Sequence, residues 1–275
     1  MKILSLSSSV AHGHVGNSAL VPPLRRLGFQ MVAVNSVQFS NHPGHGVFGG
    51  DVFAPAHVAR IIDGLAGAGF LSDFAAILSG YLGDGGNGAS LLRALDANPQ
   101  AVYVCDPVIG DAGRCYVRPD VVEFLCGPAL TRAHMLTPNL FELGVLSDAP
   151  VEGVDQAIAA ARSLLAKGPK VVVVTSLSWR DQPTCAAISA DGAWLVSTPQ
   201  LDFPRPVHGG GDLLAGLLCA HWLRGDEPPA MLENAVSGLF AVLERSQRTG
   251  GAELDLTGPL DEVCTPPRHF AARQV

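Results

Sequence analysis

Positive charge is scarce in this sequence and is nowhere gathered into a block. Lys and Arg number 18 against 25 Asp and Glu, so the formal net charge of the 275 residues is -7. Nucleic acids and anionic membrane surfaces are bound by clustered positive charge. The sequence therefore predicts neither as a partner, and we expect a small molecule instead.

Long apolar runs and cysteine pairs are also missing. No run approaches the roughly 20 residues that a membrane-spanning helix needs, and MKILSLSSSVAHG lacks the apolar region of a signal peptide. The six cysteines form no CxxC pair, and several lie in apolar runs, where a buried thiol behaves as a small hydrophobe. These absences predict a protein of the reducing cytoplasm.

Internal repeats, low-complexity tracts and linkers are absent too, while 48% of the residues are hydrophobic. A chain of this length and composition can bury a large core. We expect one domain over residues 1–275, with a loose tail from about residue 264.

Short runs rich in Val, Ile and Leu alternate with longer segments of helical period. The expected strands are residues 2–7, 31–37, 74–80, 101–107, 133–138 and 170–177, and the expected helices include 56–69, 154–168, 212–225 and 229–247. This alternation predicts a three-layer α/β/α fold with a mostly parallel sheet. Two strand-like runs around Asp191-Gly192 predict an antiparallel hairpin at one edge.

Polar residues follow or end these apolar runs. They are Ser8, Asn35, Ser79, Gly80, Tyr81, Asp106, Thr137, Asn139, Thr175 and Ser176. Because open α/β sheets bind ligands at the carboxyl ends of their strands, the set predicts a site at that edge. Each residue alone could equally be a turn or cap residue.

The stretch VHGGGDLLAG places Gly209, Gly210 and Gly211 directly before Asp212 and an apolar helix. A helix that begins here presents free N–H groups and the positive end of its dipole. Glycines let the backbone approach an anion and adopt positive φ. Asp212 would accept a proton from a hydroxyl that attacks a bound phosphate. The alternative is that Asp212 caps the helix.

Two carboxylates, Asp106 and Glu142, are expected at neighbouring strand ends. They suit a hydrated Mg²⁺ between nucleotide phosphates. The spacing of Asn139 and Glu142 also fits a capping box, which is the structural alternative. His12 and His14 have no third ligand near them in the sequence and do not predict a metal site.

Several motifs together carry a family resemblance. The stretches SVAHGHVGNSALVPPLRRLGF, NSVQFSNHPGHG, LSGYLGD, VYVCDPVIGD, LTPNLFELGVL, VVVVTSL and VHGGGDLLAGLL occur in the order and approximate spacing of pyridoxal kinases of the ribokinase superfamily. The resemblance covers about residues 2–247. It implies ATP-dependent phosphorylation of the 5′-hydroxyl of pyridoxal, with Mg²⁺, a monovalent cation such as K⁺ and a homodimer.

The resemblance also implies roles for individual residues. Asp212 matches the catalytic base, and the amides of Gly209, Gly210 and Gly211 match the anion hole. The vitamer side is matched by Ser8, Val15, Val37, Phe39, Pro43, Gly44 and Tyr81. The ATP side is matched by Asp106, Thr137, Asn139, Glu142, Thr175, Ser176, Thr198, Pro199, Gln200 and Leu201, with Asp106 and Glu142 also at the metal position.

The sequence departs from the family pattern in the glycine turn and in the substrate loop. Gly210 stands where a threonine is common, which predicts lower activity. Pro43 and His45 stand where a threonine and a tyrosine are usual, which leaves the vitamer preference open. His208 precedes the glycines, either facing the nucleotide or lying in an exposed loop.

Three other functions fit the sequence less well. A hydroxymethylpyrimidine kinase of thiamine synthesis shares the fold, but such enzymes usually place cysteine at the position of Asp212. A non-catalytic vitamin-binding protein would lose the base. A dinucleotide oxidoreductase would need G-x-G-x-x-G after the first strand, and SSSVAHGHVGN lacks it.

Overall fold

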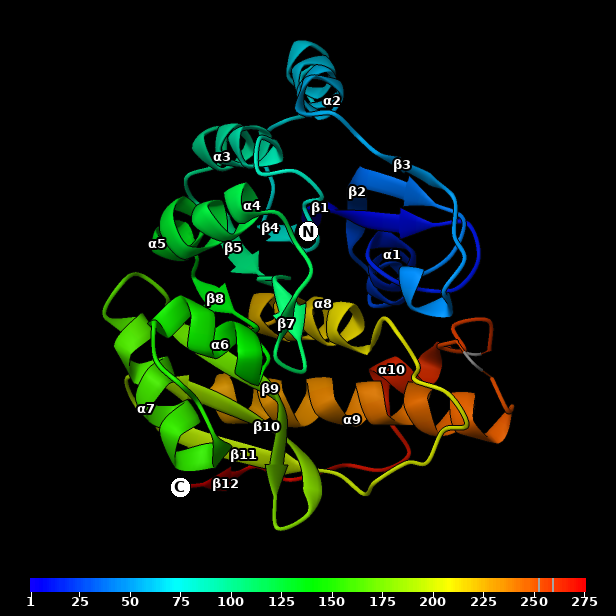
Figure 1. Ribbon diagram of the computed structural model, residues 1–275, viewed down its shortest axis with the longest axis vertical. Helices are drawn as coiled ribbons and strands as arrows, with labels where there is room; N and C mark the ends of the chain where they lie inside the picture. The colour runs from blue at the N-terminus through cyan, green and yellow to red at the C-terminus, as the bar shows by residue number, and fades with distance from the viewer. Residues whose placement is uncertain (252, 259) are drawn as a thin grey trace.

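The computed structural model describes residues 1–251, 253–258 and 260–275, and its centre is one sheet (Figure 1). The strand order is β12-β11-β10-β9-β8-β5-β4-β1-β2-β3. The strands are β1 (Lys2–Val10), β2 (Gln30–Phe39), β3 (Gly50–Val52), β4 (Ala76–Ser79), β5 (Val102–Cys105), β8 (Met135–Leu136), β9 (Val171–Trp179), β10 (Gln182–Ser189), β11 (Gly192–Ser197) and β12 (Arg273–Gln274). A separate small hairpin joins β6 (Gly110–Asp111) to β7 (Arg114–Cys115).

The middle of the sheet is parallel and its edges are antiparallel. Strands β2, β1, β4, β5, β8 and β9 run the same way, whereas β3, β10, β11 and β12 run against their neighbours. The expected α/β fold with a hairpin at one edge is confirmed, because β10 and β11 pair around Asp191-Gly192.

Helices cover both faces of the sheet. They are α1 (Asn17–Arg26), α2 (Pro55–Gly67), α3 (Asn87–Asp96), α4 (Pro119–Phe124), α5 (Leu130–Arg132), α6 (Leu140–Ser147), α7 (Gly153–Leu165), α8 (Gly210–Leu223), α9 (Pro228–Arg248) and α10 (Asp261–Cys264), with the short turns η1 (Pro43–His45) and η2 (Leu125–Ala129). Within the described ranges, no helix is long and apolar enough to cross a membrane.

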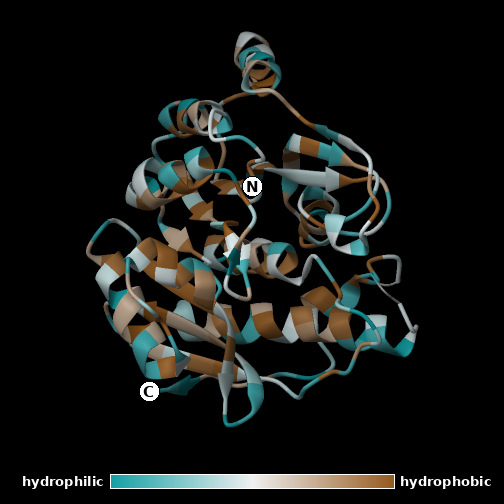
Figure 2. Ribbon diagram, in the orientation of Figure 1, coloured by the Kyte–Doolittle hydropathy of each residue, from teal (hydrophilic) through white to brown (hydrophobic). Residues whose placement is uncertain are grey.

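Two apolar clusters, one on each face, hold the layers together. Successive strand residues alternate between them: Leu4 and Ile77 join the cluster under α2, α3, α6 and α7, while Ile3 and Leu78 join the cluster under α1, α8 and α9. This is the period-two alternation of a strand buried on both faces. Figure 2 shows apolar residues along the central strands and along α8 and α9.

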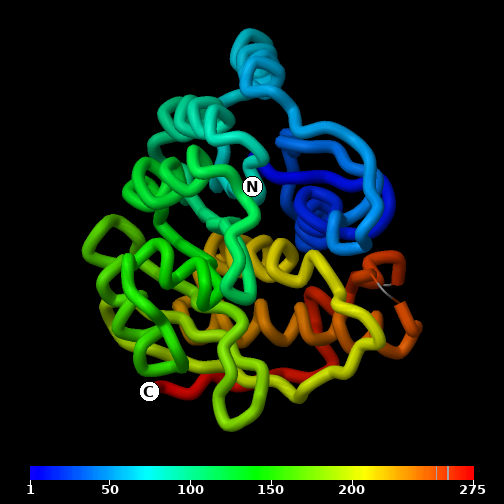
Figure 3. Tube along the Cα trace, in the orientation of Figure 1, coloured from blue at the N-terminus to red at the C-terminus, as the bar shows by residue number. Residues whose placement is uncertain are grey.

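Helix α8 lies inside the second layer, packed against both α1 and α9. Every residue from Leu213 to His221 is buried. A helix that is apolar on all sides is stable only where all sides are covered. Its first turn is thereby fixed at the carboxyl edge of the sheet, and Figure 3 shows the chain entering it next to the N-terminal segments.

The expectation of a loose tail from about residue 264 is wrong for the last residues. Strand β12 pairs antiparallel with β11, and the Val275 N–H donates to the carbonyl of Ala193 at 3.0 Å. The Phe270 ring lies edge-on to Phe240, with 4.8 Å between ring centroids. The last residues are held by the edge of β11 and by Phe240 on α9. The polarity of the sequence near its end gives no sign of these contacts.

Candidate active site

The three glycines before Asp212 adopt two different conformations. Gly209 has φ of 89° and is the N-cap of α8, and a Cβ there would collide with the carbonyl oxygen of His14. Gly210 and Gly211 are the first helical residues and have no positive φ, so the expectation of positive φ is confirmed only for Gly209. Beside Gly211 the space within 4 Å of a Cβ is free. The backbone conformation therefore requires glycine at position 209. At Gly211 the absence of a side chain leaves the start of the helix accessible to a ligand.

Asp212 lies half-buried within the first turn of α8. The N-cap of the helix is Gly209, so Asp212 is not the cap residue. Its Oδ1 lies 3.7 Å from the point where Gly80 would carry a Cβ, which places it against the end of β4. Burial raises the pKa of Asp212 to about 6, opposed by backbone hydrogen bonds from Gly16 and from Asp212 itself. A carboxylate with this pKa is ionised at pH 7 and can take up a proton near that pH.

Asp106 follows β5 and faces the same region. Its backbone N–H donates to the Ser79 carbonyl at 2.9 Å, and its Oδ1 accepts the Thr137 hydroxyl at 2.9 Å. Burial raises the pKa of Asp106 well above its usual value, and the charges of Glu142 and Asp212 raise it further. Asp106 is thus close enough to Glu142 and Asp212 for their charges to act on it.

Asn139 and Glu142 form the capping box that their spacing allows. The Asn139 side chain accepts from the Glu142 N–H at 2.9 Å, and Glu142 Oε2 accepts from the Asn139 N–H at 2.9 Å. Glu142 Oε1 accepts from the Ile109 N–H at 3.0 Å. Burial raises the pKa of Glu142 to about 7, although the hydrogen bonds from backbone N–H groups act to lower it.

Mg²⁺ fits this acidic edge as an ion that keeps its water. Both oxygens of Glu142 already accept backbone N–H groups, and no group of three His, Cys, Asp or Glu side chains in the described part of the chain is arranged to hold a metal. Mg²⁺ usually retains several waters and binds through one or two carboxylates plus substrate phosphates. Asp106 and Glu142 supply the negative charge for such an ion without forming a cage.

Thr175 and Ser176 lie inside β9 and not after it, so the expected strand end is wrong here. The pairing register of β9 and β10 shifts at this point, and Ser176 has φ of 57°. The Thr175 N–H donates to the Pro138 carbonyl at 2.9 Å, which brings the irregularity beside Asn139. Ser176 also lines a cavity of about 700 Å³ beside α6.

Residues 198–201 stand apart from this group. They follow β11, which β10 separates from β9, and the Thr198 N–H donates to the Pro183 carbonyl on β10 at 2.9 Å. The Gln200 amide bonds to the carbonyl of the next residue, Leu201. The structure thus ties Thr198 to β10, while the Gln200 bond stays within the segment Thr198, Pro199, Gln200 and Leu201.

The residues expected on the vitamer side gather where β4, β1 and β2 end. Ser8 lies inside β1 at an irregularity, and Asn35 lies inside β2, because both strands run on past their apolar cores to Val10 and Phe39. Gly16 packs so closely on Ser8 that a Cβ would collide with the Ser8 hydroxyl. The expected strand ends are therefore wrong for Ser8 and Asn35.

The apolar walls lie around this point. Val15 and Val37 are buried, and Tyr81 is half-buried, with its carbonyl accepting the Ser36 hydroxyl at 2.5 Å. The Phe39 ring lies edge-on to Phe48, 5.1 Å between centroids. Pro43 and Gly44 form the exposed turn η1 in the loop beyond β2.

Sequence reasoning missed Ser7 and Tyr116 at this site. The Ser7 hydroxyl is buried against Gly80 and has no hydrogen-bond partner among the described residues. Tyr116 lies near the acidic edge, since partial burial and the charges of Glu142 and Asp106 raise its pKa. His208, for which the sequence left open a position facing the nucleotide or in an exposed loop, stacks on His42. No periodicity marks the positions of Ser7 and Tyr116.

Known proteins of the same architecture were compared with the whole chain. The family model described as phosphomethylpyrimidine kinase matches residues 28–256. The pyridoxal kinase PdxY of Rubrobacter xylanophilus is 43% identical over 285 residues, covering 100% of this chain and 98% of that protein. Pyridoxal kinase from Leishmania donovani in complex with ADP and ginkgotoxin superposes with a TM-score of 0.90 and 30% identity, covering 100% and 99%. The same enzyme in complex with ADP and pyridoxine superposes with a TM-score of 0.90 and 29% identity, with the same coverage.

Proposed function

The chain belongs to the pyridoxal kinases of the phosphomethylpyrimidine kinase family, and on that premise we propose that it transfers the γ-phosphoryl group of ATP to the 5′-hydroxyl of pyridoxal. The product is pyridoxal 5′-phosphate, and the reaction serves vitamin B6 salvage. The observation that carries the proposal is the position of Asp212, which lies half-buried in the first turn of α8, directly after the glycines and against the end of β4.

Asp212 is the general base of this proposal. Its carboxylate accepts the proton of the 5′-hydroxyl while the hydroxyl oxygen bonds to the γ-phosphorus, the bond to the β-phosphate oxygen breaks, and ADP leaves. The amides of Gly209, Gly210 and Gly211 stabilise the charge on the transferring group. The free space beside Gly211 supports this role, because a phosphate oxygen can approach the helix start there.

The vitamer binds between the ends of β4, β1 and β2 in this proposal. Ser8 hydrogen-bonds the pyridine ring, and Tyr81 stacks on it. Val15, Val37 and Phe39 close the apolar side, while Pro43 and Gly44 cover the ring from the loop beyond β2. The support is the burial of the valines and the half-buried position of Tyr81 next to Gly80 and Asp212.

ATP lies along the acidic edge in this proposal. Asp106, Thr137, Asn139 and Glu142 serve the phosphates, Thr175 and Ser176 contact the nucleotide, and residues 198–201 border the adenosine. Asp106 and Glu142 would hold Mg²⁺, which would neutralise phosphate charge when bound. Burial is the largest cause of the raised pKa values of both carboxylates, and a cation bound between them would favour their ionised forms. A monovalent cation such as K⁺ completes the set.

Assembly and location follow the same premise. We expect a homodimer in the cytoplasm, built from one domain per chain. Val47, Phe48 and Val52 are exposed apolar side chains beside edge strand β3, and a second copy would bury them. All six cysteines are free, which suits a reducing compartment. Sedimentation velocity at micromolar concentration tests the dimer.

A coupled ADP-release assay tests the reaction. Pyridoxal, pyridoxine, pyridoxamine and hydroxymethylpyrimidine are each offered with MgATP. We expect turnover with pyridoxal and a lower kcat/KM for hydroxymethylpyrimidine. Folded protein that binds pyridoxal but releases no ADP would instead be a vitamin-binding protein, and preference for hydroxymethylpyrimidine would make it a kinase of thiamine synthesis.

A further inference from the structure

Three histidines meet at the boundary between the vitamer side and the phosphate side. The rings of His42 and His208 are stacked, with 3.7 Å between centroids and 27° between planes. The ring of His45 lies edge-on to His208 at 5.9 Å, and His45 Nε2 lies 2.6 Å from Glu253 Oε1. Residues 40–49, named here the vitamer loop, thus touch the glycine turn and the segment after α9.

The vitamer loop wraps closely around the ring of His208. A Cβ on Gly44 would lie 2.5 Å from His208 Nε2 and 2.8 Å from His42 Nδ1, so only glycine fits at this point. The Gly44 N–H donates to His42 Nδ1 at 3.1 Å, which fixes the loop turn on the His42 side chain. His208 cannot move without displacing the loop.

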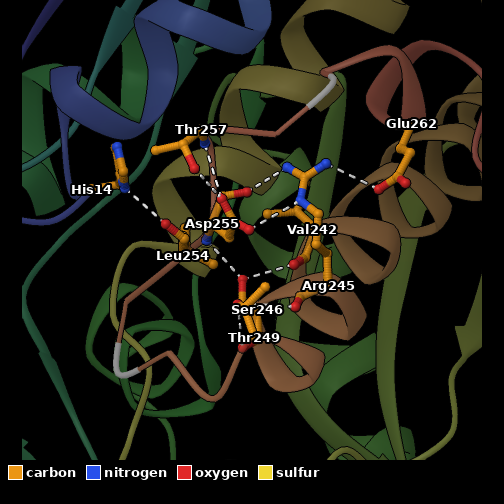
Figure 4. Close-up of polar contacts among 9 residues, drawn as sticks. All are labelled: His14, Val242, Arg245, Ser246, Thr249, Leu254, Asp255, Thr257 and Glu262. Atoms are coloured by element: carbon orange, nitrogen blue, oxygen red, sulfur yellow. Dashed lines mark hydrogen bonds and ion pairs between the residues drawn. The ribbon is translucent and has the colours of Figure 1, made fainter.

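The segment that carries Glu253 is fastened to α9 (Figure 4). The Asp255 N–H donates to the Ser246 hydroxyl at 2.7 Å, and Arg245 bonds to Asp255 and Glu262. His14 Nδ1 lies 2.7 Å from the Leu254 carbonyl oxygen, so the loop after β1 is held by the same segment. Glu253 is therefore a fixed point against which the vitamer loop rests through His45.

His208 is also one residue away from the anion-binding glycines. Gly209 packs against the carbonyl of His14, with the Leu254 side chain 3.2 Å from the place of a Cβ. A shift of the His208 ring is thus passed along one peptide bond to the start of α8.

We propose that His208 is a positioning residue that ties the vitamer loop to the glycine turn, so that both sides of the site close together while the His42 and His208 rings are neutral. The inference rests on the proposed function for its substrates. Protonation places like charges in a stack 3.7 Å apart and drives the loop away from the turn.

The electrostatics of the cluster support the direction of this effect. Burial lowers the pKa of His42 from 6.5 to about 4, helped by the charges of His208 and His45. Burial and His45 lower the pKa of His208, and Glu253 opposes them. The closed state therefore loses stability as pH falls below 6.5 towards 4. The ion pair of His45 with Glu253 works the other way, since it is charged only when His45 is protonated.

The magnitude follows from linkage. A proton that binds the open loop with a pKa of 6.5 and the closed loop with a pKa near 4 weakens closure by about tenfold between pH 7.5 and 5.5. We expect KM for pyridoxal to rise by about tenfold over this range through loop opening. kcat falls over the same range because Asp212 becomes protonated, which separates the two effects.

The experiment compares His42→Phe with wild type and with His269→Phe. Phenylalanine at position 42 keeps a flat ring on His208 and removes the imidazole from which the tenfold effect was derived. His269 is a control whose carboxylate neighbour is Glu233. We expect His42→Phe to lose most of the KM rise and to keep the fall in kcat, while the control follows wild type. Pyridoxal's own ionisation cancels in the comparison. Parallel KM profiles for wild type and His42→Phe would overturn the proposal.

A second measurement does not need catalysis. NMR titration of the imidazoles should show His42 titrating well below 6.5 in wild type and closer to 6.5 in His208→Ala, where the stack is lost. If His42 titrates at the same pH in wild type and in His208→Ala, the proposal that His208 holds the vitamer loop is wrong. If no vitamer is phosphorylated by any variant, the proposed function fails, and the NMR titration still decides whether His208 holds the loop.

Discussion

Replacing Asp212 by asparagine separates a general base from a helix-stabilising charge, because the two roles predict opposite changes in stability. The amide is nearly isosteric and cannot accept the hydroxyl proton. General-base catalysis contributes about 10² to 10⁴ in rate, so we expect kcat to fall by at least about a hundredfold. The ATP dissociation constant should stay unchanged or improve slightly, since a negative charge beside the γ-phosphate is removed.

The expected stability change follows from the raised pKa. Folding moves the pKa of Asp212 from 3.8 to about 6, and one unit corresponds to about 1.4 kcal/mol. The ionised carboxylate thus costs up to about 3 kcal/mol above pH 6, reduced by its partial exposure to solvent. The asparagine variant should therefore gain about 1 to 3 kcal/mol at pH 7.5. The gain shrinks as pH falls from 6 and disappears below 3.8, where the wild-type carboxyl is neutral in both states.

Urea unfolding at pH 7.5 and 4.5 and steady-state kinetics at pH 7.5 make the test. Asp191→Asn removes one exposed carboxylate in the turn between β10 and β11, and serves as the control for net charge. A carboxylate that only complements the dipole of α8 would behave differently, because its loss costs about 0.3 to 1 kcal/mol. Near-normal turnover together with lower stability would refute the base.

The other predictions concern the rest of the site. Tyr81→Ala should weaken binding of pyridoxal by at least about fivefold and leave ATP binding unchanged by calorimetry, since a stacked ring contributes about 1 kcal/mol; equal losses would mean damage to the fold. Gly209→Ala should lower stability by at least about 1 to 2 kcal/mol because of its positive φ. Gly211→Ala should instead fold normally and lose turnover, and full activity would show that no phosphate approaches there. Asn139→Ala should cost about 1 kcal/mol in urea unfolding through the lost helix cap, and an unchanged midpoint would contradict the capping role.

The layers of the fold were predictable because apolar period and burial coincide. The run KVVVVTSL gives β9, whose residues alternate between two buried faces, and DLLAGLLCAHWLRG gives a helix covered on all sides. Local sequence decides these elements. The small hairpin of β6 and β7 was not predictable, because two-residue strands carry no period.

The site was predictable where chemistry follows a strand end, as for Asp106 and Thr137. The site was less predictable where tertiary packing decides the backbone conformation. Ser8 and Ser176 lie at irregularities inside strands, which depend on the neighbouring strand's register. The contacts of His208 depend on a loop more than 160 residues away in the sequence, and local pattern carries no signal for them.

The short strand β12 has a consequence for how the sheet is completed during synthesis. β12 is synthesised well after β11, so the outer edge of β11 is unpaired in the meantime. An unpaired edge strand is a template for pairing with another chain. A nascent or truncated chain that lacks residues 270–275 therefore carries an edge that can pair with another chain, and β12 covers that edge once it is made.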